Sequence, residues 1–208
     1  MMMDAHELFV TAMAIVLSYG LGSVPTGLWM GKTWRGIDIR EHGSQNIGAT
    51  NTLRVLGKKF GAVALAGDVL KGMIAVLALG ALSAWPHAPL ACGAAAIAGH
   101  TWSVFLRFHG GKGVATSAGV LLALIPVSTI TGIAVFALVA GLSRMVSAGS
   151  ITAAAVIGAL VLILERDPLT HLDHDPVIRG VVLLMVAVVL IRHRANIQRI
   201  MRGEEHKF

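Results

Sequence analysis

Charged residues are scarce in this sequence, and the scarcity excludes an ordinary soluble domain. Only 13% of the 208 residues are Asp, Glu, Lys or Arg, about half the share found in soluble domains, while 55% are hydrophobic. A regular alternation of apolar and polar residues is also missing, so the apolar runs predict helices rather than strands. Runs such as 60–84 and 176–191 approach or reach the roughly 20 residues that cross the hydrocarbon of a bilayer.

Cysteine and early positive charge are also nearly absent. The single Cys92 lies in an apolar run, which excludes a disulfide framework within the chain and predicts a small core residue. The stretch MMMDAH before the first apolar run holds Asp4 and His6 but no Lys or Arg. Because a secretory signal peptide has a positive n-region, we expect the first apolar segment to be a retained helix.

The apolar segments predict an all-α, polytopic integral membrane protein that forms one domain over residues 1–208. Pro126 divides the segment 114–141, and 28 residues is long for one crossing, so we interpret this segment as two helices. We therefore expect about seven transmembrane helices, near residues 7–31, 60–84, 89–106, 114–125, 127–141, 148–164 and 176–191.

The distribution of Lys and Arg predicts the orientation of these helices. With the N-terminus outside, 14 of the 17 Lys and Arg residues fall on the cytoplasmic side, whereas Arg166 and Arg179 fall outside and Lys71 lies within a helix. An odd number of helices then places the basic C-terminus in the cytoplasm. Basic loops beside anionic lipid headgroups also account for the net charge of +6 without a nucleic-acid partner.

Two of the predicted inner loops are rich in groups that bind anions. The first is a run of Gly, hydroxyl and amide residues from Gly43 to Thr52 that closes on Arg54, whose guanidinium can bind phosphate or carboxylate through two hydrogen bonds. The second places three glycines around Lys112 directly before an apolar helix, where the helix dipole favours an anion. An ordinary solvated loop is the alternative for the first segment.

Neither of two glycine-lysine sequences is a nucleotide-binding P-loop. Gly113 follows Lys112 where that motif needs Ser or Thr, and the stretch from Gly27 to Lys32 is one residue too short. We therefore reject a nucleoside triphosphatase. Gly27 and Gly31 are interpreted as a close helix-packing face, the common meaning of GxxxG in an apolar segment.

Two further inner segments carry polar side chains. Ser147 and Ser150 lie at the start of a predicted helix, where they either cap the helix or bind a ligand. His193 and Asn196 are three residues apart at the end of the last helix and so share a helix face. Their neighbours Arg192, Arg194 and Arg199 are expected to complement the helix dipole and to fix topology.

Ionisable residues elsewhere give weaker signals. Asp68 and Lys71 are three residues apart within a predicted transmembrane helix, so they are expected to form a structural ion pair, although Asp68 could instead support the site. A cluster of possible metal ligands falls on a predicted outer loop, away from every other signal, at His171, Asp173, His174 and Asp175. We expect a polar loop there and neither a metal nor a cofactor, because the sequence has no HxxEH or CxxC pattern.

Taken together, the inner segments resemble the bacterial acyl-phosphate:glycerol-3-phosphate acyltransferase family, known as PlsY. The matching motifs occur in order over nearly the whole chain: GSxNxGATNxxR, GHxxxxFLxFxGGKGVAT, VSxxS and RHxxNIxR. The departures are Gln45, where the family usually has Gly, and variation at Arg107 and His109. The resemblance implies a transmembrane acyltransferase domain in the bacterial inner membrane that transfers an acyl group from acyl phosphate to the 1-hydroxyl of sn-glycerol 3-phosphate, giving lysophosphatidic acid.

The family's site, carried over by motif, falls on residues from all four segments. The resemblance implies catalytic roles for Arg54, Lys112 and His193, and a weaker site candidate at Ser150. It implies substrate binding by Ser44, Asn46, Thr50, Asn51, His100, Gly111, Gly113, Thr116, Ser147 and Asn196. Besides its two substrates and the bilayer, the protein could contact the enzyme that supplies the acyl phosphate.

The chemistry of the residues agrees with this resemblance. Acyl phosphate is already activated, so the site needs cations and backbone N–H groups for two phosphates and an oxyanion more than it needs a strong acid. None of the nine His residues has the Asp five positions later that the His-x4-Asp acyltransferases use. Either His193 is the base or the substrate phosphate takes the proton, and the resemblance favours the phosphate.

Two other classes of protein compete with the acyltransferase interpretation. A transporter of a phosphorylated solute often contains inverted repeats and binds at the bilayer midplane. No second copy of GSQNIGATN or GGKG occurs here, and the donors gather on one face. A purely structural membrane protein would not explain this concentration of ligating loops.

The predicted topology can be tested with reporter fusions. A reporter fused after Phe208 is expected in the cytoplasm and one fused at the N-terminus outside, because 14 of the Lys and Arg residues fall on the inner side. A series of fusions along the chain measures the number of crossings. An even number would overturn both the seven helices and the shared location of the motifs.

Overall fold

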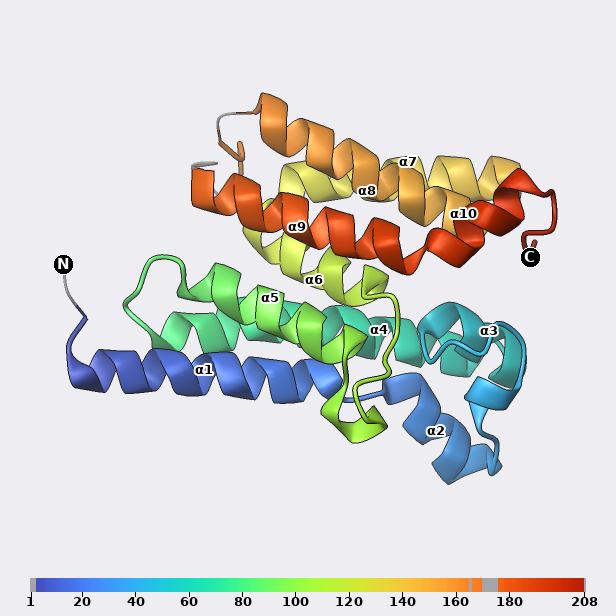
Figure 1. Cartoon of the computed structure of the whole chain (residues 1–208), viewed down its shortest axis with the longest axis horizontal. Helices are drawn as coiled ribbons and strands as arrows, with labels where there is room; N and C mark the ends of the chain where they lie inside the picture. The colour runs from blue at the N-terminus through green and yellow to red at the C-terminus, as the bar shows by residue number, and fades with distance from the viewer. Residues whose placement is uncertain (1–2, 165, 170–175, 208) are drawn as a thin grey trace. The chain divides into compact units, whose positions relative to one another are not determined.

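All regular elements in the described part of the chain are helices. The computed structural model describes residues 3–164, 166–169 and 176–207 (Figure 1). The chain forms two compact units, Met1–Ala123 and Leu124–Phe208. The first contains α1 (Ala5–Ser23), α2 (Thr26–Arg35), η1 (Ile39–Glu41), α3 (Ala49–Leu56), α4 (Lys58–Ile74) with its continuations η2 (Ala75–Leu79) and η3 (Gly80–Leu82), α5 (Ala88–Thr101), η4 (Val104–Leu106) and α6 (Val114–Leu124). The second contains α7 (Pro126–Ser143), α8 (Val146–Ile163), α9 (Pro176–Arg192) and α10 (Arg194–Met201).

Five helices of the described residues are long and apolar enough to cross a membrane. They are Ala5–Ser23, Lys58–Leu82, Ala88–Leu106, Pro126–Ser143 and Val146–Ile163, and α9 together with α10 makes a sixth if that bent pair is one span. The apolar helix α6 is shorter, at 11 residues. The prediction of an all-α, polytopic membrane protein is therefore confirmed, while seven crossings and the orientation of the termini stay predictions.

The first predicted helix, 7–31, is wrong as a single element. The chain leaves the helix at Val24, whose backbone is extended, and α2 starts after Pro25. Proline has no N–H and disfavours helical backbone in the preceding residue, which explains the break. Pro126, by contrast, begins α7 after a break at Ile125, as predicted for the segment 114–141.

The last predicted helix, 176–191, is followed by an element that was missed. The chain bends by 53° between α9 and α10, with His193 at the junction. The basic, polar sequence of α10 lacks the apolar length of a membrane helix, so the criterion of apolar length does not predict it.

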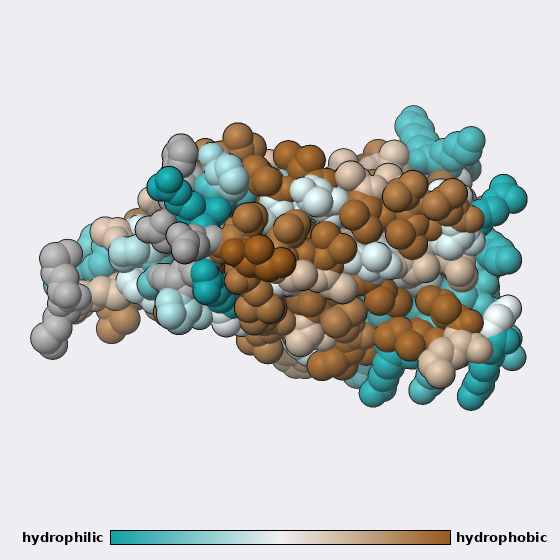
Figure 2. Space-filling model, turned by 90° about the horizontal axis from the view of Figure 1, so that it is seen from above, coloured by the Kyte–Doolittle hydropathy of each residue, from teal (hydrophilic) through white to brown (hydrophobic). Residues whose placement is uncertain are grey.

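Large apolar side chains are exposed on the helices that are candidates to cross the bilayer. Leu138 and Leu142 of α7, Ile163 of α8 and Leu184 of α9 are each more than half exposed. Figure 2 shows hydrophobic side chains across the middle of the face in view and hydrophilic side chains gathered at its right-hand end. Such surfaces are costly in water but match lipid chains.

Glycines allow α1 and α5 to pack backbone against backbone in the first unit. A Cβ on Gly22 would overlap the backbone of Ala96, and one on Gly99 would overlap the carbonyl of Tyr19. Two hydrogen bonds tie the ends of the pair together, from Tyr19 Oη to the Trp102 carbonyl at 2.6 Å and from Ser103 Oγ to the Ser23 carbonyl at 2.6 Å. The C-terminal ends of α1 and α5 are thereby held in register.

Two substitutions on α1 test this contact. Gly22→Ala should destabilise the protein by about 1–3 kcal/mol, because the new methyl meets backbone that cannot move aside. Gly20→Ala is the matched control: a Cβ there meets nothing within 4 Å, so it should be neutral or stabilise by up to about 1 kcal/mol through helix propensity. Thermal unfolding in detergent measures both. Equal midpoints for the two variants would refute the close packing.

Candidate active site

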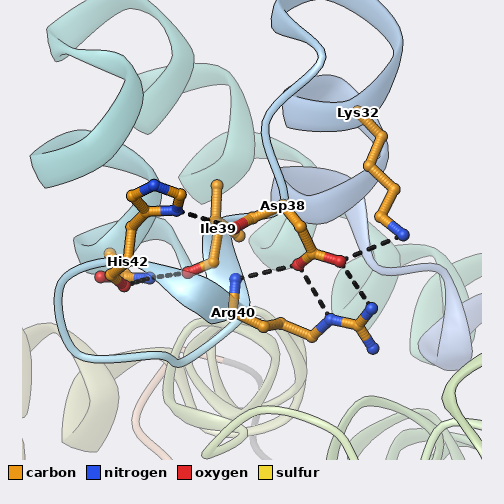
Figure 3. A network of polar contacts seen from close by, with 6 residues as sticks. Lys32, Asp38, Ile39, Arg40 and His42 are labelled. Carbon is orange, nitrogen blue, oxygen red and sulfur yellow. Dashed lines mark hydrogen bonds and ion pairs between the residues drawn. The ribbon is translucent and has the colours of Figure 1, made fainter.

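A charged turn begins the first predicted loop of the site. Asp38 Oδ1 accepts hydrogen bonds from the backbone N–H of Arg40 at 3.0 Å and from its Nε at 2.9 Å. Oδ2 lies 2.6 Å from Arg40 Nη2 and 3.1 Å from Lys32 Nζ at the end of α2 (Figure 3). The hydrogen bonds from Arg40, followed by that from Lys32, hold the pKa of Asp38 well below its usual range. The Asp38 carboxylate therefore stays ionised at neutral pH, and its hydrogen bonds fix the shape of the turn.

Asn51 shapes the rest of this loop. Its Nδ2 donates to the carbonyls of Ile39 at 2.8 Å and His42 at 3.1 Å, and its Oδ1 accepts from the backbone N–H of Ser44 at 2.8 Å. The side chain is buried, and these three bonds occupy both ends of its amide. Asn51 was predicted to bind substrate; in the structure its amide organises the backbone beside Ser44.

The loop next turns through residues in unusual conformations. Gln45 has φ of 58°, in the left-handed region where a side chain is costly and glycine is not. This conformation gives a physical reason for the glycine that the resemblance places there, and Gln45 adopts it nevertheless. Asn46 Oδ1 then accepts from the Gly48 N–H at 2.9 Å, and α3 begins at Ala49. Thr50 is half-buried in its first turn, and Arg54 is exposed in its last.

A small apolar cluster joins this loop to the second predicted loop. Leu28, Ile39 and Ile47 are buried together, and they contact the partly buried side chains of Val55, Leu56 and Leu106. Leu106 belongs to η4, next to the glycine-rich segment. Gly27 and Gly31 let α2 pack closely against neighbouring segments, as predicted. A Cβ on Gly27 would overlap the side chain of Thr52 in α3. Figure 1 shows α2, α3 and the segment between α5 and α6 at the end of α1 away from the N-terminus.

Backbone hydrogen bonds to the end of α5 hold the second loop. The Gly110 N–H donates to the Thr101 carbonyl at 3.0 Å, and the Gly111 N–H donates to the His100 carbonyl at 2.9 Å. A Cβ on Gly110 would overlap the His100 carbonyl, and Gly113 has φ of 81°. Only glycine satisfies both demands without strain. The turn places the half-buried Lys112 two residues before the first residue of α6.

Buried hydroxyl groups surround the start of α6. Thr101 Oγ1 and Ser117 Oγ lie near Gly113, and Thr116, a predicted substrate-binding residue, is fully buried. None of these three hydroxyls has a hydrogen-bond partner among the described residues. Because a buried hydroxyl without a partner is costly, this region is built for a polar occupant or water.

The predicted ion pair of α4 exists and reaches the site. Lys71 Nζ lies 2.8 Å from Asp68 Oδ1, and both side chains are buried. The same nitrogen lies 2.8 Å from His100 Nδ1, so a predicted substrate-binding residue is in contact with the pair. The ion pair of Asp68 with Lys71 is therefore confirmed, whereas support of the site by Asp68 stays a prediction.

In the second unit, Glu205 brings predicted residues together. Its Oε1 accepts from Ser147 Oγ at 2.8 Å and from Asn196 Nδ2 at 2.6 Å, and its Oε2 accepts from Arg199 Nε at 2.8 Å. Burial alone would raise the pKa of Glu205, but these donors outweigh it and the pKa is lowered. The carboxylate fixes two predicted substrate-binding side chains and pairs with Arg199, a contact that the sequence did not predict.

The capping interpretation of the serines is wrong. Helix α8 begins at Val146 with Met145 at the N-cap, and Met145 makes no side-chain cap. Ser147 therefore lies inside the helix, where its hydroxyl contacts Glu205, and Ser150 Oγ donates to the Val146 carbonyl at 2.9 Å. The helix starts two residues earlier than predicted, which moves both serines past the cap.

His193 lies buried at the bend between α9 and α10. Its Nδ1 is 2.7 Å from the Val189 carbonyl, and because a carbonyl only accepts, Nδ1 is the donor. In the neutral imidazole Nε2 then carries the lone pair, as a general base requires.

The predicted outer cluster of possible metal ligands lies outside the described residues. It consists of His171, Asp173, His174 and Asp175. Among the residues that are described, His, Cys, Asp and Glu do not form a group of three that could hold a metal ion.

Comparison with known proteins identifies the class of this chain. The family model described as glycerol-3-phosphate acyltransferase matches residues 12–203. The glycerol-3-phosphate acyltransferase of Geobacillus kaustophilus is 46% identical over 199 residues, which cover 95% of this chain and 96% of that protein. That of Trichlorobacter lovleyi is 47% identical over 191 residues, covering 92% and 94%.

A solved membrane enzyme has the same fold. The crystal structure of PlsY, an integral membrane glycerol 3-phosphate acyltransferase, in its glycerol 3-phosphate form matches with a TM-score of 0.84 and 33% identity, covering 95% of each chain. Its lysophosphatidic acid form matches with a TM-score of 0.82 and 32% identity. The fold and the motifs thus define a helical membrane acyltransferase. This chain belongs to the glycerol-3-phosphate acyltransferase family, as the match over residues 12–203 and the similarity to PlsY show.

Sequence reasoning missed Glu205 because nothing periodic marks it. Gly203 turns the chain at the end of α10: its N–H bonds to the Ile200 carbonyl at 3.1 Å, and the Glu204 N–H bonds to the Arg199 carbonyl at 2.8 Å. This is the Schellman pattern, with Gly203 left-handed at φ of 73°. A glycine that follows a basic helix end predicts such a turn. It does not predict which of the two following glutamates folds back against the helices.

Neighbouring glutamates allow a matched test of this contact. Glu205→Gln removes the charge that three donors share, so we expect a loss of about 1–3 kcal/mol in stability and reduced activity. Since the folded pKa is lowered, this stabilisation is complete above the usual carboxyl range and fades as the pH falls through the folded pKa. Glu204→Gln, at an exposed position, should unfold like the parent protein. Indistinguishable melting curves for the two variants would contradict the assignment.

Proposed function

We propose that this protein transfers a fatty acyl group from acyl phosphate to the 1-hydroxyl of sn-glycerol 3-phosphate, giving lysophosphatidic acid and phosphate. The observation that supports it most is the Gly110–Gly113 turn, whose backbone is fixed to the end of α5 and which presents Lys112 at the start of α6. A cation and a helix N-terminus in one place favour a phosphate group. PlsY, a solved relative, has crystal structures of a glycerol 3-phosphate form and of a lysophosphatidic acid form.

The proposed reaction needs charge stabilisation more than acid catalysis. The substrate hydroxyl oxygen attacks the acyl carbon, its bond to that carbon forms, and the bond from the carbon to the phosphate oxygen breaks. Negative charge grows on the carbonyl oxygen in the transition state, and the departing phosphate ends as hydrogen phosphate after it gains the hydroxyl proton, either directly or by way of His193. Lys112 and Arg54 supply positive charge for the phosphates and the oxyanion.

The hydroxyl proton goes to one of two bases. Because Nδ1 of His193 donates to the Val189 carbonyl, the neutral ring carries its lone pair on Nε2. The substrate phosphate is the other acceptor, and the family resemblance favours it. A proton taken by phosphate needs no catalytic dyad, in keeping with the missing His-x4-Asp motif.

The location of the protein follows from its helices and charges. It is a bacterial membrane protein, and we place it in the cytoplasmic membrane with the site on the cytoplasmic face, where most Lys and Arg residues are expected. Acyl phosphate would reach the site from that side. Contact with the enzyme that supplies it is part of this proposal.

A direct assay tests the proposed function. Purified protein in lipid nanodiscs is incubated with glycerol 3-phosphate and palmitoyl phosphate, and lysophosphatidic acid is followed by mass spectrometry. Turnover is expected with acyl phosphate but not with palmitoyl-CoA, because a thioester has no phosphate on its acyl carbon to take the hydroxyl proton, and the sequence has no His-x4-Asp dyad to replace it. Robust turnover with acyl-CoA alone would contradict the proposed donor.

Variants of Arg54 and Lys112 test whether these cations bind phosphate, and a variant of Arg194 is the control for a charge that is expected only to fix topology. Arg54→Lys keeps the charge but loses the planar fork, so if Arg54 binds phosphate through two hydrogen bonds the rate should still fall severely. Lys112→Ala should lower the rate about a hundredfold or more, the scale for loss of one electrostatic stabiliser. Arg194→Ala, at an exposed position, is the control and should remain near normal. Normal turnover for Arg54→Lys or Lys112→Ala, in folded and inserted protein, would exclude the proposed site.

A further inference from the structure

Three buried ionisable side chains lie in contact beside the glycine turn. Asp68 and Lys71 come from α4 and His100 from the end of α5, and each residue is at most 4% exposed. Charged groups at this depth are costly unless each is paired, so the arrangement needs an explanation beyond packing. The proposed function assigns none of its steps to Asp68 or Lys71.

The ammonium group of Lys71 lies close to three acceptors. It forms an ion pair with Asp68 Oδ1 at 2.8 Å and lies within hydrogen-bond distance of His100 Nδ1 at 2.8 Å and of the Val24 carbonyl at 3.0 Å. An ammonium only donates, so Nδ1 of His100 must accept. The proton of the neutral imidazole therefore lies on Nε2. Asp68, 3.7 Å from the ring nitrogen, balances the charge of Lys71.

The other ring nitrogen of His100 lies against the glycine turn. A Cβ on Gly111 would overlap Nε2, so a residue larger than glycine does not fit over the ring. The Gly111 N–H also donates to the His100 carbonyl at 2.9 Å. Main chain and side chain of His100 thus both contact the residue that precedes Lys112.

We propose that the Asp68–Lys71 pair is a positioning device that fixes the Nε2–H tautomer and ring orientation of His100, and through Gly111 the place of Lys112. A membrane-embedded ion pair would in this way hold the turn that presents the catalytic ammonium. Lys71 and Asp68 act through His100 and do not touch substrate. The catalytic consequence rests on the proposed function, whereas the tautomer of His100 does not.

Nitrogen NMR of the whole protein in nanodiscs reads the tautomer directly. With ¹⁵N-labelled histidine, and the His100 signals assigned by their loss in His100→Asn, Nδ1 should resonate as an unprotonated nitrogen and Nε2 as a protonated one. The double variant Asp68→Asn/Lys71→Met removes both charges together, so no unpaired charge is left buried. Its His100 should shift toward the opposite tautomer or a mixture. Lys59→Met, at an exposed position of α4, should leave the spectrum unchanged.

Kinetics supply the second measurement. The double variant should lose roughly ten- to a hundredfold in kcat, the scale for a misplaced catalytic group, with a smaller change in KM. His100→Asn keeps an acceptor oxygen for Lys71 while removing the Nε2 donor, so it should fold with near-normal stability and show the same loss in kcat.

The results that would refute the inference differ from the result that would refute the proposed function. A wild-type His100 protonated on Nδ1 would refute the inference even if the double variant failed to fold. An unchanged tautomer, or an unchanged kcat, in a folded double variant would also refute it. Absence of acyl transfer by the wild-type protein would refute the proposed function alone, because the spectrum is recorded without substrate.

Discussion

The site depends on the pair of backbone hydrogen bonds that join Gly110 and Gly111 to the last carbonyls of α5. A helix ending in a membrane protein leaves carbonyls that must find donors, and here the glycine turn provides them. The same bonds fix the residue next to Lys112. The same two hydrogen bonds therefore satisfy the carbonyls at the end of α5 and position Lys112. The turn approaches α5 so closely that only glycine fits at positions 110 and 111.

A second constraint is that short polar side chains must be held before a small substrate arrives. Asn51 does this for the backbone beside Ser44, and Glu205 does it for Ser147 and Asn196. In both places an amide or carboxylate makes three hydrogen bonds within the protein. Catalysis by charge stabilisation benefits from such fixed donors, because they do not reorganise as charge develops.

The sequence predicted the class of fold and the family, because apolar length and glycine-rich basic loops follow local rules. It correctly divided the segment at Pro126 and paired Asp68 with Lys71. It failed at Pro25, where a break inside an apolar run was overlooked, and at Ser147, where the helix began earlier than expected. The contact of Lys71 with His100 and the return of Glu205 join residues 29 and 58 positions from their partners, which no local pattern encodes.

The most direct test of the account is a distance between the Lys112 ammonium and a substrate phosphorus. Solid-state NMR on ¹⁵N-lysine-labelled protein with a non-hydrolysable acyl phosphonate measures the nitrogen–phosphorus dipolar coupling. The account predicts a coupling that corresponds to a direct N–H···O contact of about 2.8 Å and that disappears in Lys112→Gln. A bound phosphonate whose coupling is absent, or persists in Lys112→Gln, would contradict it.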